Sequence, residues 1–163
     1  MNAERDEDAQ LFHTSPRPDP LRCRQASYPI VVPVEARYAD MDVNGHLNNL
    51  ALESLHENAR ATMNSRAAPG IYRRGRRSLR LVAAQNVVHF LAEAHWPATI
   101  HAGVGVGRLG NTSYVASSAL FVDGACLSVC DTVLVAVADD GRPISIPEDM
   151  RTALSALTLG RRE

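Results

Sequence analysis

Lysine is absent from this 163-residue sequence, and all 17 of its basic residues are arginine. Acidic residues number 18, so the formal net charge is -1 and gives no global attraction to nucleic acid or an anionic membrane. No apolar run approaches the roughly 20 residues of a membrane-spanning helix, and the acidic N-terminus lacks a signal-peptide core. We therefore expect a cytoplasmic protein with no membrane span and no nucleic-acid partner.

Cysteine is also scarce, and the chain has three: Cys23, Cys126 and Cys130. The last two lie four residues apart in a predicted strand, about 13 Å at about 3.3 Å per residue. A disulfide needs Cα atoms within about 7 Å. No C-x-x-C pair is present, and three histidines (His89, His95 and His101) lack ligand-like spacing to carboxylates or cysteines. We expect neither a disulfide framework nor a metal site.

Turn-forming residues divide the chain into one strand, one long helix and four further strands. The first strand is expected at 30–38 and the helix at 50–63, and the later strands at 81–92, 99–109, 112–122 and 125–138. Pro97, Gly110-Asn111 and Asp123-Gly124 separate the later strands in the pattern of antiparallel hairpins. Pro147 opens a short terminal helix. The fold class is therefore α+β, with an antiparallel sheet of about five strands and one long helix.

The expected long helix has one apolar stripe, formed by Ala51, Leu52, Leu55, Ala59 and Met63. His56 belongs to the opposite, polar side, where we expect it to be solvated. One helix covers only one face of the sheet, so we also expect pairing with a second copy, as a homodimer or homotetramer.

Composition sets the expected domain boundaries. Residues 1–28 combine an acidic start with three prolines and few large apolar residues, which is typical of a disordered tail. Residues 29–158 form the single expected domain, and 159–163 form a short C-terminal tail. Within the domain, Gly103, Gly105 and Gly107 leave one face of their strand without side chains, which favours close approach by another element or a ligand.

The stretch from Asp40 to Asn49 concentrates carboxylates, carboxamides and one imidazole in a loop between the first strand and the helix. Its Asn44-Gly45 pair is a strong turn signal. Asn48 or Asn49 is suited to cap the helix, whose first turn leaves backbone N–H groups free. Such a helix N-terminus stabilises the negative charge that a carbonyl oxygen acquires when its carbon is attacked.

The run Asp40-Met41-Asp42-Val43-Asn44-Gly45-His46-Leu47-Asn48-Asn49 at a strand-to-helix junction resembles the hotdog-fold thioesterases. It is most similar to the 4-hydroxybenzoyl-CoA thioesterase branch and its acyl-carrier-protein relatives. Shorter pieces agree: Glu57-Asn58-Ala59-Arg60, Leu109-Gly110-Asn111-Thr112-Ser113 and Ile146-Pro147. The resemblance covers about residues 30–157 and implies a hotdog fold, a sheet wrapped around one long helix, with active sites built between subunits.

The resemblance implies that Asp42 is the catalytic carboxylate, with Asn44 and His46 as further catalytic residues. An accessible Asp is ionised at neutral pH and can attack a thioester carbonyl or activate water. Both mechanisms remain open. His46 is suited to protonate the departing thiolate, and N–H groups around Asn48 and Asn49 to hold the oxyanion. The substrate is an acyl thioester of coenzyme A or acyl carrier protein, with no separate cofactor.

Two features depart from the family pattern. Leu50, Ala51 and Leu52 stand where an aromatic often follows the Asn-Asn pair, which changes the shape of the acyl pocket. Some relatives carry basic residues for the nucleotide where this chain has Gly110 and Asn111. The arginine cluster at 73–80, with Arg76 and Arg77 at its centre, is then the local candidate for phosphate contacts, or it is only a solvated loop. The turn of Gly110, Asn111, Thr112 and Ser113 is a candidate substrate contact or only a hairpin cap.

Two other functions compete with hydrolysis. A hotdog-fold enoyl-CoA hydratase or dehydratase also uses an Asp and a His a few residues apart. Its motif has a proline after the Asn and one more residue before the His, so Gly45 and the shorter gap from Asp42 to His46 disfavour it. A non-catalytic acyl-thioester-binding protein is the other alternative, and it requires Asp42 to be dispensable.

Overall fold

The computed structural model describes residues 15–73 and 79–160. The strands are β1 (Ile30–Glu35), β2 (Arg80–Phe90), β3 (Thr99–Leu109), β4 (Ser113–Val122) and β5 (Ala125–Val137). The helices are α1 (Asn49–Ala67) and α2 (Glu148–Ser155), and three short 3₁₀ turns are η1 (Pro20–Cys23), η2 (Gln25–Ser27) and η3 (Tyr38–Asp40). Neither helix in these ranges is long and apolar enough to cross a membrane.

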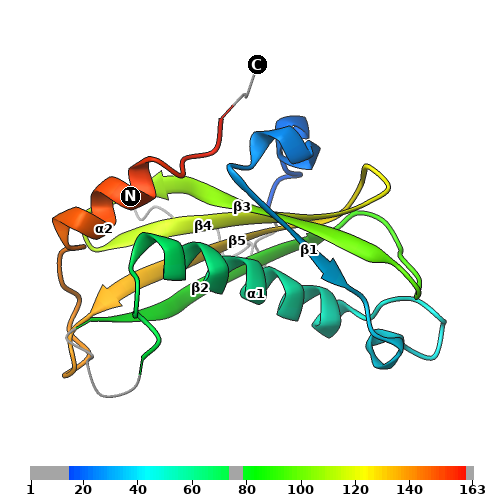
Figure 1. The fold of residues 1–163 in the computed structure, drawn as a ribbon, viewed down its shortest axis with the longest axis horizontal. Helices are drawn as coiled ribbons and strands as arrows, with labels where there is room; N and C mark the ends of the chain where they lie inside the picture. The colour runs from blue at the N-terminus through cyan, green and yellow to red at the C-terminus, as the bar shows by residue number, and fades with distance from the viewer. Residues whose placement is uncertain (1–14, 74–78, 161–163) are drawn as a thin grey trace, which may run out of the picture.

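The five strands form one antiparallel sheet in the order β1-β3-β4-β5-β2, and α1 lies across one face of it (Figure 1). The expected sheet around one long helix is therefore confirmed. Glu35 at the end of β1 pairs with Thr99 at the start of β3. The loop after β1 and the β2–β3 connection consequently share one end of the sheet, and α2 lies at the other end (Figure 1).

Helix α1 begins where Asn48 caps it, because the Asn48 side chain accepts a hydrogen bond of 2.7 Å from the Ala51 N–H. The helix is longer than the expected 50–63 and ends just before Ala68-Pro69. Its buried face consists of Leu52, His56, Ala59, Met63, Asn64 and Ala67. This face is rotated from the predicted apolar stripe, since Ala51 and Leu55 are only partly buried.

The prediction that His56 is solvated is wrong, because its side chain is 1% exposed between α1 and the sheet. Its Nδ1 lies 2.8 Å from the Ser118 hydroxyl of β4, and its Nε2 lies 2.8 Å from the Ser128 hydroxyl of β5. Two serines pointing at one imidazole satisfy both ring nitrogens, so the polar ring is tolerated in the core. The helical period alone does not reveal such cross-sheet partners.

The opposite face of the sheet is partly covered by the segment before β1. Tyr28 is buried there in a cluster with Ala119, Phe121 and Val129. A Cβ atom on Gly103 would come within 2.7 Å of the Tyr28 Cγ, so the bare strand face that the glycines predict is filled by this ring. The expectation of a disordered tail at 1–28 is wrong for η1, η2 and Tyr28, while residues 1–14 lie outside the described part of the chain.

Side-chain contacts fix this segment to the sheet. Arg22 of η1 donates to the Asp131 carboxylate of β5 at 3.0 Å, and Asp131 also accepts from the Ser117 hydroxyl. From the other terminus, the Leu159 N–H donates to the Val106 carbonyl at 2.9 Å and its side chain joins the Tyr28 cluster. Residue 159 therefore packs on the domain instead of starting a tail.

The turn between β3 and β4 packs against α2. Arg151 of α2 donates hydrogen bonds of 2.9 Å to the carbonyls of Gly110 and Asn111, and the Ile146 N–H donates to the Asn111 carbonyl. Met150 and Leu154 of α2 are buried against the core. These contacts give the turn a clear structural role at the α2 end of the sheet.

His56 should make stability depend on pH. Burial, with the positive charges of Arg60 and Arg22, lowers the pKa of His56 to about 3, against about 6.5 in an unfolded chain. Between these values the unfolded chain binds a proton that the folded chain does not. The contribution of this group to the free energy of unfolding is therefore complete above pH 6.5 and falls as pH drops toward 3. By pH 5 the loss is about 2 kcal/mol.

His56→Gln provides the matched control, because glutamine can bond both serines but does not titrate. We expect the unfolding free energy of wild type minus that of His56→Gln to fall by about 2 kcal/mol from pH 7 to pH 5 in urea titrations. Carboxylates common to both proteins cancel in this difference. A difference independent of pH would contradict the neutral, buried imidazole.

Candidate active site

Asp40 stabilises the start of the loop after β1 through hydrogen bonds with Arg37. Its buried carboxylate accepts hydrogen bonds from the Arg37 N–H at 2.8 Å and from the Arg37 guanidinium at 2.7 Å. The hydrogen bonds and charge of Arg37 hold the pKa of Asp40 below its usual value. The Asp40 carbonyl also accepts from the Asn48 N–H at 2.8 Å. Asp40 therefore shapes the loop and sets the start of α1.

Asp42 opens a tight turn that ends at His46. The Asp42 N–H donates to the His46 carbonyl at 2.8 Å, and the Gly45 N–H donates to the Asp42 carbonyl at 3.1 Å. Gly45 has φ +77°, a left-handed conformation that suits glycine. The exposed Asp42 carboxylate accepts from the Asn44 N–H at 2.8 Å through Oδ1. Its Oδ2 accepts no hydrogen bond within residues 15–73 and 79–160, so it can face a substrate.

The N-terminus of α1 follows this turn directly. Asn48 has a structural role, since its side chain caps the helix and its N–H donates to the Asp40 carbonyl. Asn49 and Leu50 are the first two helical residues, whose N–H groups have no intrahelical acceptor. Any stabilisation of an oxyanion here therefore falls to Asn49 and Leu50 and not to Asn48.

A cavity of about 310 Å³ connects these groups. Its polar wall consists of Asp42, His46, Asn49 and Glu93, and its apolar wall includes Leu47, Leu52, Phe90 and Leu91. Three segments supply the lining: the turn after β1, the first turn of α1, and the end of β2. A polar reactive end beside an apolar surface suits a substrate that joins a polar group to an acyl chain.

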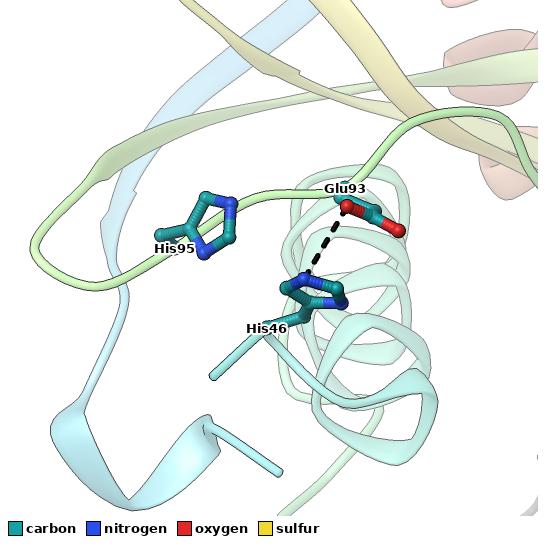
Figure 2. Close-up of side chains that lie close together, drawn as sticks. All are labelled: His46, Glu93 and His95. Atoms are coloured by element: carbon teal, nitrogen blue, oxygen red, sulfur yellow. Dashed lines mark ion pairs between the residues drawn. The ribbon is translucent and has the colours of Figure 1, made fainter. Parts of the chain in front are cut away.

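The two segments that flank the cavity are paired through their backbones. The Leu47 N–H donates to the Ala94 carbonyl at 2.8 Å, and both side chains are buried. Because neighbouring side chains in an extended chain point to opposite sides, His46 on one segment and Glu93 and His95 on the other point outward together. Figure 2 shows these three side chains converging.

The three converging residues also interact. His46 Nε2 lies 3.3 Å from a carboxylate oxygen of Glu93, and the rings of His46 and His95 meet edge to face at 4.9 Å between centroids. One ligand atom from each of His46, Glu93 and His95 lies within 4.8 Å of the other two. The fold thus brings His46 beside Glu93 and His95, a grouping that the spacing along the sequence did not indicate.

Other expected site residues lie elsewhere. Asn44 is exposed at the tip of the turn, and it supports Asp42 through its backbone N–H and not from the cavity wall. The Gly110–Ser113 turn follows β3, whose eleven residues span about 33 Å, so within one chain it is far from Asp42. Arg76 and Arg77 lie outside the described residues. Sequence reasoning missed Phe90, Leu91 and Glu93, although Glu93-Ala94-His95 has the alternation that places two polar side chains together.

The family model described as the thioesterase-like superfamily matches residues 36–154. The chain belongs to this superfamily. The matched range starts just before the Asp40–Asn49 loop and ends in α2, so it includes the whole cavity. No match among curated protein sequences reaches significance.

Solved structures agree with membership in the thioesterase-like superfamily. A protein from Pseudomonas aeruginosa is 28% identical with a TM-score of 0.77, over 85% of this chain and 98% of that one. A thioesterase from Thermus thermophilus complexed with coenzyme A and Zn is 29% identical with a TM-score of 0.72, over 80% and 95%. A second P. aeruginosa protein, a putative thioesterase, is 27% identical with a TM-score of 0.67, over 76% and 95%. The hotdog fold is thereby confirmed.

Proposed function

We propose that the chain hydrolyses acyl thioesters of coenzyme A or of acyl carrier protein. The observation that carries the proposal is the cavity in which Asp42, His46 and the first turn of α1 face an apolar wall. Membership in the thioesterase-like superfamily supports thioester hydrolysis in general, and a T. thermophilus relative complexed with coenzyme A supports this carrier. The proposed reaction uses no separate cofactor, since the carrier is part of the substrate.

Asp42 carries the chemistry in this proposal. Its turn holds Oδ1 through the Asn44 N–H and leaves Oδ2 for the thioester carbonyl or for a water molecule. Attack by the carboxylate gives an acyl-enzyme anhydride that water then hydrolyses, whereas general-base catalysis gives the free acid in one addition and elimination. In both cases the carbonyl oxygen gains negative charge, which the N–H groups of Asn49 and Leu50 stabilise. In this proposal His46, which lines the same cavity, protonates the thiolate that leaves.

The proposal includes assembly of the chain with at least one second copy. Strand β2 lies at the edge of the sheet, and Val82 and Phe90 on it are 45% and 42% exposed. An exposed edge strand pairs readily with another strand, and β2 against β2 of a second copy gives a closed, two-fold arrangement. The Gly110–Ser113 turn can share a substrate with Asp42 only if it comes from another subunit, because it is far away within one chain.

The substitution Asp42→Asn distinguishes the hypothesis of an enzyme from that of a binding protein. The change removes the charge and keeps the shape, so we expect substrate Kd to hold while kcat falls by about 10²–10⁴-fold, the usual contribution of an acid–base group. The measurements are free-thiol release from acyl-CoA and acyl carrier protein, and substrate binding by calorimetry. A variant that keeps more than about a tenth of wild-type kcat would show that Asp42 is not the catalytic residue.

Asp40→Asn is the matched control, two residues away with the same chemical change. Because Asp40 bonds Arg37 at the loop base, we expect a lower melting temperature and a smaller loss of kcat than for Asp42→Asn. If the two variants lost the same activity and the same stability, the loop geometry alone would explain both. Enoyl-CoA hydration is measured alongside, since activity there would favour the hydratase alternative.

The wild-type chain should sediment as a dimer or larger assembly at micromolar concentration. The physical reason is the exposed edge of β2 together with its apolar side chains. Analytical ultracentrifugation at several concentrations measures the assembly, and thiol release is followed in the same samples. A monomer with full activity would contradict the two-copy arrangement.

Arg76 and Arg77 are proposed to contact the phosphates of coenzyme A or the acidic surface of a carrier protein. Changing both to glutamine should raise KM several-fold for an acyl-CoA and leave KM for the matching acyl-pantetheine unchanged, since pantetheine lacks the nucleotide phosphates. The effect should shrink in high salt, where screening shortens the reach of exposed charges to about 3 Å at 1 M. Arg108→Gln, an exposed arginine of β3, is the control, and equal KM changes for both substrates would contradict phosphate contact.

A further inference from the structure

We propose that His46, Glu93 and His95 form a binding site for a divalent transition-metal ion of the zinc class. The three residues come from two segments that the Leu47–Ala94 backbone bond holds side by side. One ligand atom from each lies within 4.8 Å of the others, as Figure 2 shows. This inference goes beyond thioester hydrolysis, because it concerns metal binding and is tested without measuring catalysis.

His95 is held in the tautomer that a metal ligand needs. Its Nδ1 lies 2.9 Å from the Gly45 carbonyl oxygen, and a carbonyl can only accept, so Nδ1 carries the proton. The Nε2 lone pair is then free to bind a cation. Metal-ligating histidines commonly donate their other N–H to a backbone carbonyl in this way, which fixes the ring. Because Gly45 precedes His46, this bond also ties His95 to the segment that carries the second imidazole.

The spacing of His46 and Glu93 already fits a shared ion. His46 Nε2 and Glu93 Oε2 are 3.3 Å apart. Two atoms bonded at about 2.0–2.1 Å to a tetrahedral zinc ion lie about 3.3 Å from each other. Glu93 and His95 are exposed, so rotation of their side chains can bring the third ligand closer without disturbing the core. An exposed His–Glu ion pair alone contributes little to stability and does not account for the placement of His95.

The donor set identifies the class of ion. Two imidazoles and one carboxylate suit zinc, cobalt and nickel, whereas magnesium and calcium prefer oxygen ligands. Three protein ligands also leave a tetrahedral ion one position for water or another molecule. Since His46 and Glu93 both line the cavity that contains Asp42, an ion held by them would lie at the wall of that cavity. While His46 Nε2 binds the ion it cannot donate a proton to the leaving thiolate, so the proposed acid role of His46 belongs to the metal-free chain.

The test is calorimetric titration of the untagged 163-residue chain with Zn²⁺ after removal of metals by a chelator. We expect one saturable site per chain, weakened at least ten-fold in His95→Ala and in Glu93→Gln. His101→Ala, a histidine of β3 outside the cluster, should bind Zn²⁺ like wild type. Circular dichroism melting curves confirm that each variant is folded. Absence of a saturable site in wild type, or equal affinity in wild type and His95→Ala, would overturn the proposal.

Co²⁺ distinguishes this site from the cysteines, since Cys23 and Cys126 are only partly buried. Cobalt bound by imidazole and carboxylate gives visible ligand-field bands without the near-ultraviolet charge-transfer band of a cobalt–thiolate bond. We expect the visible bands in wild type, their loss in His95→Ala, and their retention in His101→Ala. A thiolate charge-transfer band at one equivalent of Co²⁺ would assign the site to cysteine and overturn the proposal.

Discussion

The hydrogen bond from the Leu47 N–H to the Ala94 carbonyl is the constraint on which the candidate site depends. It joins the turn after β1 to the connection between β2 and β3, and its two side chains are buried. Alternation then turns His46, Glu93 and His95 outward as one group. Residues at the end of β2 and at the start of α1 then line the same cavity beside Asp42.

Asp40 and Asp42 lie two residues apart in one short loop, but their surroundings differ. Asp40 is buried, and Arg37 donates hydrogen bonds to both of its carboxylate oxygens. The Asp40 side chain therefore stabilises the loop that leads into α1. Asp42 is exposed, and its turn uses only one of its oxygens. The difference arises from position, because Asp40 lies in η3 under the loop and Asp42 lies at the start of the turn, beside the cavity.

The sequence predicted local features well and long-range contacts poorly. The bounds of β3 match because Pro97 and Gly110 delimit it, and the Asn48 cap marks the start of α1 within one residue. The burial of His56 was missed because its serine partners come from β4 and β5, which the helical period does not include. Tyr28 was assigned to a tail because the surface that receives it is formed by Gly103 and the strands beside it. Gly45 and His46, which His95 contacts, likewise lie on a segment far away in the sequence.

The histidines differ in what their two ring nitrogens contact, and this difference sets their chemistry. In His56 both nitrogens meet serine hydroxyls inside the core, so the ring has no free lone pair and no access to solvent. In His95 the Gly45 carbonyl engages Nδ1 only, which leaves Nε2 available. His46 lies between these cases, with Nε2 directed at the exposed Glu93 carboxylate. The availability of a ring nitrogen therefore depends on the fold around each histidine and not on the residue type.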